Sequence, residues 1–153
     1  MARAGLCLAL LLGGCGLVHK DVEISQAFTV GGRPPSDPQV DLATPLAASQ
    51  GDLAHLSGVT LRAARIESTD GLDVGFVSGA TLTLRANGSL PELQLATLPS
   101  PSGTTRADLV VDSSKDLKPY LQAGSLLTAK LTYAPTPTAA RGLVLILTLR
   151  GSL

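Results

Sequence analysis

The chain has 153 residues, with 12 Lys and Arg, 12 Asp and Glu, and a formal net charge of zero at pH 7. Because it contains no block of basic residues, neither nucleic acid nor an anionic membrane surface is implied as a partner. Aromatic residues make up 3% of the chain and Trp is absent, which disfavours an aromatic platform for stacking sugars or a protein-binding hot spot built on Trp.

The first residues have the layout of a secretory signal peptide. Arg3 supplies a short basic start, and the apolar run over residues 4–12 is too short to cross a bilayer as a mature helix. The run ends at Leu12-Gly13-Gly14-Cys15. We expect residues 1–14 to be removed. The remaining chain has the size of one domain and can bury a hydrophobic core without disulfides or metal sites to stabilise it.

This tetrapeptide resembles the lipobox of bacterial lipoproteins, in which the chain is cut just before a diacylated cysteine. The resemblance implies lipidation of Cys15 by two glycerol-linked acyl chains, usually with a third on the new amine, and hence an effectively permanent membrane anchor. Members retained at the inner membrane commonly carry Asp next, where this chain has Gly16. The implied location is the bacterial cell envelope, at the outer rather than the inner membrane. The alternative is an ordinary cleaved signal with a chance cysteine.

The two cysteines leave no thiol for chemistry in the folded body. Cys7 lies within the signal, and Cys15 would carry lipid. A disulfide, a thiolate metal ligand and a Cys nucleophile are therefore not expected. We expect residues 15–21 to form the lipidated N-terminus with a short tether, and residues 22–153 to form the domain.

Apolar and polar residues alternate along most of the domain, which is the pattern of half-buried strands. The alternation begins at Val22 and continues to Val30, after which Pro34, Pro35 and Pro38 prevent a strand. Residues 39–58 are expected to cross between strands, with extended pieces around 40–42 and 53–56. Further strands are predicted over residues 59–68, 80–86, 92–98, 106–111, 127–133 and 143–149.

Some details of these strands can also be predicted. Arg62 and Arg65 would lie on opposite faces of a straight strand, so a bulge is expected in this strand. Leu82 and Leu84 should face the core, and Asn87-Gly88 should turn the chain. The same alternation predicts an inward face for Leu127 and outward faces for the polar residues Thr81, Thr83, Thr128 and Lys130. The last two strands should pair as an antiparallel hairpin across the loop over residues 135–141.

One helical turn is predicted over residues 112–124. Asp116 can act as its N-cap, Pro119 falls early enough that its missing N–H costs nothing, and Gly124 can end it. A second single turn could be capped by Asp73 ahead of Phe76.

These elements predict an all-β fold, an antiparallel β-sandwich of immunoglobulin-like or jelly-roll-like type with one or two short helical turns. A characteristic order of motifs covers about residues 55–150. It consists of a Val-Thr-Leu strand from Val59, the Asp70-Gly71 turn, a loop with Phe76 and the Asp-Leu-x-Pro-Tyr-Leu run from Asp116. It is similar to small β-sandwich lipoproteins of δ-proteobacterial type with no known activity.

Catalytic candidates are few. A hydrolase needs a nucleophile beside a base, and only His19 and His55 offer an imidazole. His55 has Ser57 and Asp52 nearby in the sequence, but no nucleophile-elbow pattern surrounds them. We therefore interpret both histidines as solvated or structurally satisfied, and expect no catalytic residue and no enzyme activity.

The aspartates are interpreted as turn and cap residues rather than as acid–base pairs or metal ligands. Asp112-Ser-Ser-Lys-Asp116 lacks the spacing and the glycine of an EF-hand loop and places Lys115 among the would-be Ca²⁺ ligands. No metal and no cofactor is expected. The carboxylates considered for these roles are Asp70, Asp73, Asp108, Asp112 and Asp116.

The functional expectation is a lipid-anchored binding or structural module without catalysis, whose partner could be another envelope protein bound through a sheet edge or the loops distal to the membrane. The segment 143–148 is apolar on both faces, which indicates either a docking edge or the central strand of the core, and we favour the central strand. Two alternatives are a ligand carrier or lipid chaperone, which needs an internal void, and a hydrolase using Asp52, His55 or Asp108–Asp116.

Overall fold

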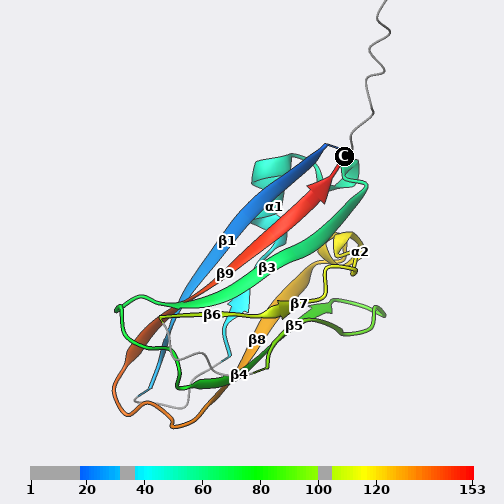
Figure 1. The fold of residues 1–153 in the computed structure, drawn as a ribbon. Coiled ribbons are helices and arrows are strands. Elements are labelled where there is room, and N and C mark those ends of the chain that lie inside the picture. Colours follow the sequence, from blue (N-terminus) through cyan, green and yellow to red (C-terminus); the bar gives the residue numbers. More distant parts are fainter. Residues whose placement is uncertain (1–17, 32–36, 100–104) are drawn as a thin grey trace, which may run out of the picture.

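The computed structural model describes residues 18–31, 37–99 and 105–153, which form two antiparallel β-sheets packed face to face (Figure 1). The four-stranded sheet has the order β1-β9-β3-β6. Its strands are β1 (His19–Val30), β9 (Arg141–Ser152), β3 (Gly58–Ser68) and β6 (Arg106–Asp108). The first strand begins at His19, so the last residues of the predicted tether belong to the folded domain.

The second sheet has five strands in the order β2-β8-β4-β5-β7. They are β2 (Gln39–Val40), β8 (Ser125–Tyr133), β4 (Val77–Ala86), β5 (Leu93–Leu98) and β7 (Val110–Val111). The turn predicted at Asn87-Gly88 joins the antiparallel pair β4 and β5, and Gly88 adopts the positive φ of 122° that favours glycine.

The connectivity is that of a jelly roll. The first and last strands, β1 and β9, lie side by side in one sheet, while β2 and β8 lie side by side in the other. Outer strands therefore wrap around inner strands as successive nested pairs, which is the winding of a jelly roll and not of an immunoglobulin sandwich. The predicted antiparallel β-sandwich is confirmed, in its jelly-roll-like form.

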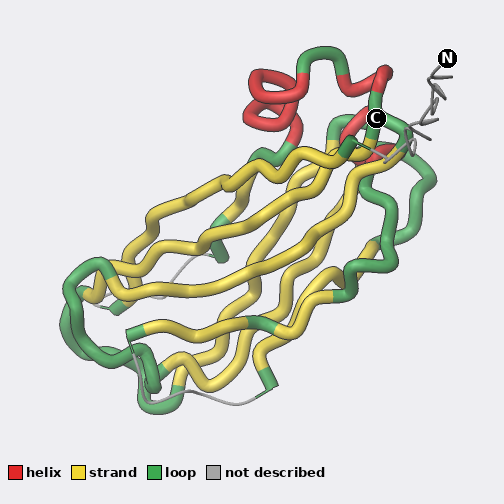
Figure 2. Tube along the Cα trace, turned by 45° about the horizontal axis from the view of Figure 1, so that its top comes forward, coloured by secondary structure: helices red, strands yellow, loops and turns green. Residues whose placement is uncertain are grey.

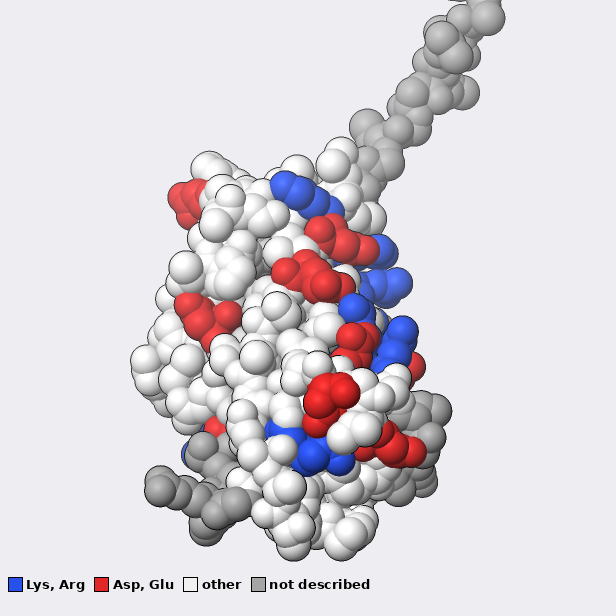
Figure 3. All heavy atoms as spheres, turned by 90° about the vertical axis from the view of Figure 1, so that its left-hand side faces the viewer, with Lys and Arg blue, Asp and Glu red and all other residues white. Residues whose placement is uncertain are grey.

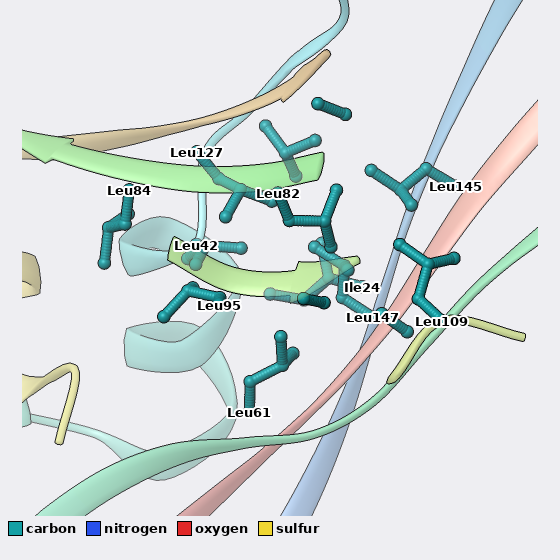
Figure 4. Packing of buried hydrophobic residues seen from close by; sticks show 14 of the residues in the cluster. Ile24, Leu42, Leu61, Leu82, Leu84, Leu95, Leu109, Leu127, Leu145 and Leu147 are labelled. Atoms are coloured by element: carbon teal, nitrogen blue, oxygen red, sulfur yellow. The ribbon is translucent and has the colours of Figure 1, made fainter. Parts of the chain in front are cut away.

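The core lies between the sheets and consists mainly of aliphatic side chains. Leu82 and Leu127 from one sheet meet Leu61 and Leu147 from the other, each at most 1% exposed (Figure 4). Full burial of one such side chain contributes about 1.5–3 kcal/mol. The alternation that predicted Leu82 and its neighbours on the inner face is confirmed.

One edge of the sandwich is closed by a strand that changes sheets. The prediction of a single strand over residues 106–111 is wrong, because the chain leaves β6 at Leu109 and continues as β7 in the other sheet. Leu109 N–H donates to the Ala64 carbonyl of β3, and Asp112 N–H donates to the Leu95 carbonyl of β5. This crossing covers the edges of both sheets at once.

The predicted hairpin of the last two strands is also wrong. β8 pairs with β2 and β4, whereas β9 pairs with β1 and β3, so the loop between them crosses from one sheet to the other. Alternation assigns each strand's side chains to a face but does not encode its partner. The bulge predicted in β3 is confirmed, and it lies between Leu61 and Ala63.

Short helices gather at one end of the sandwich, where the chain enters β1 and leaves β9 (Figure 2). They are α1 (Ala43–Gln50), the 3-10 turn η1 (Leu53–His55) and α2 (Lys118–Gln122). Pro119 lies at the start of α2 and Gly124 follows its end with φ 73°, as predicted. The N-cap position itself is Leu117, one residue later than predicted, but the Asp116 carboxylate still accepts from the first helical N–H, that of Lys118. Within the described ranges, no helix is long and apolar enough to cross a membrane.

The helix α1 was not predicted, and η1 replaces a piece expected to be extended. Only Leu46 of α1 is buried, so the helix has no apolar stripe that a periodicity could reveal. Its beginning is stabilised by the Asp41 carboxylate, which accepts hydrogen bonds from the N–H groups of Ala43 and Thr44. The turn predicted after Asp73 is present without a helix, since Val77 N–H donates to the Val74 carbonyl.

Candidate binding surface

The predicted lipidation site, Cys15, lies outside the described residues, but the point where the chain enters the fold is well defined. His19 starts β1 beside the end of β9, and its Nδ1 lies 3.0 Å from Ser152 Oγ. Leu153 N–H donates to the Val18 carbonyl at the same end. His19 therefore takes part in tying the two chain ends together.

His55 and Asp52, the residues considered for a hydrolase, are both occupied in forming η1. The Asp52 carboxylate accepts a hydrogen bond from Ala54 N–H at 2.9 Å, and the His55 N–H donates to the Asp52 carbonyl. The His55 side chain is exposed. This arrangement is that of a capped turn.

The carboxylates at 108, 112 and 116 engage separate partners. Asp108 pairs with Arg106, and Asp112 accepts from Ser114 N–H and pairs with Lys115. Asp116 accepts from Val59 N–H and Lys118 N–H, each at 3.0 Å, and so holds the start of α2 against β3. The interpretation as turn and cap residues is confirmed for Asp112 and Asp116, whereas Asp108 ends the strand β6 and pairs with Arg106 of the same strand. Among the described residues, no group of three His, Cys, Asp or Glu could hold a metal ion.

At the opposite end, Arg141 fixes the loop between β3 and β4. Its guanidinium pairs with Asp70 at 2.8 Å, donates to the Asp73 carbonyl and lies 4.9 Å from the centre of the Phe76 ring. The hydrogen bonds from Arg141 and Ser68 hold the pKa of Asp70 well below its usual value. These contacts fix the ends of two strands and leave the loop tip exposed.

Tyr133 extends this cluster at the end of β8. Its ring stacks on Phe76 with centroids 6.1 Å apart. The side chain is half-buried, and this burial raises its pKa to about 12. The phenol therefore stays neutral at physiological pH and acts as packing.

The outer face of the four-stranded sheet, here called the ion-pair face, is covered by mutually satisfied charges. Arg150 of β9 binds both carboxylate oxygens of Asp21 on β1, at 2.7 and 2.8 Å. Arg65 of β3 binds Glu67 at 2.6 Å and reaches across the sheet to Glu23 on β1 at 3.3 Å. Viewed from the β1 edge, acidic and basic side chains interleave along this side of the molecule (Figure 3).

The ion-pair face includes the outer side of β9, the strand that is apolar on both faces. β9 is hydrogen-bonded to β1 on one side and to β3 on the other, so the interpretation of segment 143–148 as a central strand is confirmed. Ile146 lies on its outer face, opposite Arg65 in register, and is only 8% exposed. The Arg65–Glu23 pair joins the two strands that flank β9, and so lies on the same outer face as Ile146.

The outer face of the five-stranded sheet, here called the polar face, has a different composition. Thr83 of β4 lies opposite Thr128 of β8, which lies opposite Gln39 of β2, while Gln94 of β5 lies opposite Thr83 on the other side. These four neutral side chains, here called the polar row, cross four strands in register. In the part of the chain that the structure describes, none of them hydrogen-bonds to another protein group.

Hollows open on the polar face around this row. One has a volume of about 420 Å³ and a second about 300 Å³, and they share Gln39, Arg85 and Thr128 in their walls, so they form one groove. Arg85 pairs with Glu92 across the groove wall. A third hollow, of about 390 Å³, adjoins Gln94 on β5. All of these hollows are open to solvent on the outside of the sandwich.

Only part of this surface could be predicted from the amino-acid pattern. Alternation predicted Thr81, Thr83, Thr128 and Lys130 on outward faces, because each lies next to an inward apolar residue. It could not show that Thr83 and Thr128 face each other. Gln39 was missed because it lies in a two-residue strand within a segment interpreted as a crossing.

Comparisons with known proteins identify no relative in sequence. No protein-family model and no curated protein matches the chain. Solved structures with a distant likeness include turnip yellow mosaic virus, with 14% identity, a TM-score of 0.39, and coverage of 99% of this chain and 89% of that chain. Desmodium yellow mottle tymovirus gives 16% identity, a TM-score of 0.31, and 99% and 92% coverage. Tobacco streak virus coat protein gives 10% identity, a TM-score of 0.30, and 87% and 86% coverage.

Proposed function

We propose that this protein is a lipid-anchored lipoprotein of the bacterial cell envelope, at the outer membrane, that acts as a binding module without catalysis. The anchor rests on Leu12-Gly13-Gly14-Cys15 after the signal-like run. The single observation that carries the binding role is the polar row, a set of exposed and half-buried hydrogen-bonding side chains that make no hydrogen bond within the described protein. Unused hydrogen-bonding groups aligned in a groove are available to a ligand.

The packing of the interior favours this module over a ligand carrier. A carrier needs room between the sheets, whereas the leucines that face each other there are almost fully excluded from solvent. The hollows around the polar row lie outside the sandwich. The engaged states of Asp52 and Asp116 likewise favour a binding role over hydrolysis.

The anchor is tested by the Cys15→Ala variant in a fractionation experiment. The variant should leave the membrane fraction while circular dichroism still reports a β-rich body, and intact mass of the parent protein should show an acylated N-terminus. Retention of Cys15→Ala in membranes, or an unmodified sulfur in the parent protein, would refute the anchor.

The binding role is tested by crosslinking on intact cells followed by recovery of the attached molecule. An envelope protein or another envelope component should be recovered with the wild-type chain. Substitution of both threonines of the polar row, Thr83→Val with Thr128→Val, should reduce that recovery. Equal recovery with and without these hydroxyls would remove the polar row from the binding surface.

A further inference from the structure

We propose that the polar row binds an uncharged polysaccharide, that is, a neutral chain carrying many hydroxyl groups. This inference deepens the proposed binding role and rests on it, but it does not depend on the lipid anchor. It starts from the hydrogen-bonding capacity of the row. Each threonine hydroxyl and each glutamine amide can both donate and accept, which is the capacity that a sugar hydroxyl complements.

The charges around the row argue for a neutral ligand. The walls of the larger hollow carry Arg85 and Lys130 against Asp37 and Glu92, so the two signs are equal in number. Arg85 is already paired with Glu92. An anionic ligand such as a phosphate or a polyuronate would need a net excess of cations here, because its charge must be compensated when it loses water.

The floor of the groove argues against a peptide. β8 is bonded to β2 and β4, and β4 is bonded to β8 and β5, so these central strands offer no free backbone edge to an extended peptide. Side-chain pockets for a peptide are also not evident, since the row presents hydroxyls and amides. A lipid tail is disfavoured for the same reason, because it would desolvate these groups without replacing their hydrogen bonds.

The dimensions favour a chain over a single small molecule. Within the groove, Gln39, Thr128 and Thr83 span two inter-strand spacings, about 10 Å, and Gln94 beside the third hollow extends the row to about 14 Å. The two hollows that share Gln39 and Thr128 are continuous and open to solvent, so a long ligand could enter and leave the groove without ending in it. Exposed aromatic rings do not take part, so recognition here depends on hydrogen bonds and not on ring stacking, and affinity for a short oligomer should be weak.

The test compares soluble hexasaccharides with matched alternatives, using the full lipidated chain in dodecylphosphocholine micelles. Neutral probes are cellohexaose, maltohexaose and hexa-N-acetylchitohexaose. Hexagalacturonate serves as the anionic comparator, and a Ser-Gly decapeptide serves as the peptide comparator. At least one neutral probe should bind more tightly than both comparators in isothermal titration calorimetry.

Matched variants then locate the site. Thr83→Val and Thr128→Val keep the side-chain shape and strand preference but remove one hydroxyl each, and each should weaken binding roughly 2- to 10-fold. Thr60→Val, on the ion-pair face, should leave binding unchanged. The inference is overturned if no neutral probe binds, if a comparator binds equally well, or if the two row variants bind like the parent chain. None of these results would affect the proposed anchor or a protein partner recovered in the cell experiments, so failure of this inference can be told apart from failure of the proposed function.

Discussion

The two outer faces of the sandwich differ in how their polar side chains are partnered. On the ion-pair face, Arg150 pairs with Asp21 on the adjacent strand β1, and Arg65 pairs with Glu67 on its own strand and with Glu23 on β1, across β9. On the polar face, Thr83 and Thr128 lie in register with no such partners among the described residues. One face is therefore completed by the protein itself, and the other has hydrogen-bonding capacity to spare. The difference separates a surface that stabilises the fold from a surface available to a ligand.

Among substitutions that distinguish the two faces, Ile146→Ala should cause the largest loss of stability. Because Ile146 is only 8% exposed, the substitution should lower the free energy of unfolding by about 2 kcal/mol. The matched change Thr81→Ala on the polar face should stay within about 0.5 kcal/mol. Urea denaturation followed by circular dichroism measures both. Similar losses at the two positions would mean that the faces do not differ in this way.

The next effect concerns the ion pairs themselves. Arg65→Met keeps the apolar stem but removes the charge, and a double-mutant cycle with Glu23→Gln should give a coupling of about 0.2–1 kcal/mol. The coupling should shrink in about 1 M salt, where screening acts over roughly 3 Å. A coupling unaffected by salt would contradict an electrostatic origin.

Acid should weaken the fold through the carboxylates paired with arginine. The pKa of Asp21 is lowered by its hydrogen bond from Arg150, and that of Asp70 is lowered by Arg141. A carboxyl whose folded pKa is depressed binds protons more readily when unfolded, so its stabilisation is present above about pH 4 and is lost as the pH falls through the folded pKa. Denaturation midpoints measured from pH 5 to pH 2 should fall for the parent chain.

The denaturation midpoints of the variants Asp21→Asn and Asp70→Asn should fall less steeply between pH 5 and pH 2, since each variant lacks one titrating group. The polar-row variants should follow the parent curve. An Asn variant with the parent's full acid dependence would show that its carboxylate does not contribute.

The smallest effect on stability should come from the polar row. Thr83→Val and Thr128→Val remove hydroxyls of half-buried side chains that have no described protein partner, so the free energy of unfolding should change by less than about 0.5 kcal/mol. Thermal unfolding of the two variants checks this. A large loss at either position would show that the hydroxyl serves the fold and is not available to a ligand.

From the sequence it was possible to predict which residues of a strand face the core, but not which strands pair with each other. Alternation placed Leu82 and Leu127 inward because burial of one face is local information, repeated every second residue. The partners of β9 depend on contacts with β1 and β3, which lie far away in the chain, and this explains the wrong hairpin. The helix α1 was missed for a different reason, because a helix with one buried residue leaves no periodic pattern.

The same limit applies to the candidate surface. Each member of the polar row resembles an ordinary solvated strand residue when taken alone. Its significance comes from the registers that align Gln39 with Thr128 and Thr83 with Gln94. By contrast, the predicted roles of Asp112 and Asp116 followed from turn chemistry within a few residues, and the hydrogen bonds confirm them.

The most direct test of the central claim uses the side-chain amides of the glutamines as reporters. The ¹⁵N-labelled chain is titrated in micelles with the three neutral hexasaccharides, and the side-chain NH₂ signals are followed by NMR. Gln39 and Gln94 should shift in a saturable way, while Gln26, Gln50 and Gln122 should stay in place. Shifts confined to the latter three, or no saturable shift at Gln39 and Gln94 with any of the sugars, would contradict the assignment of the polar face as the binding surface.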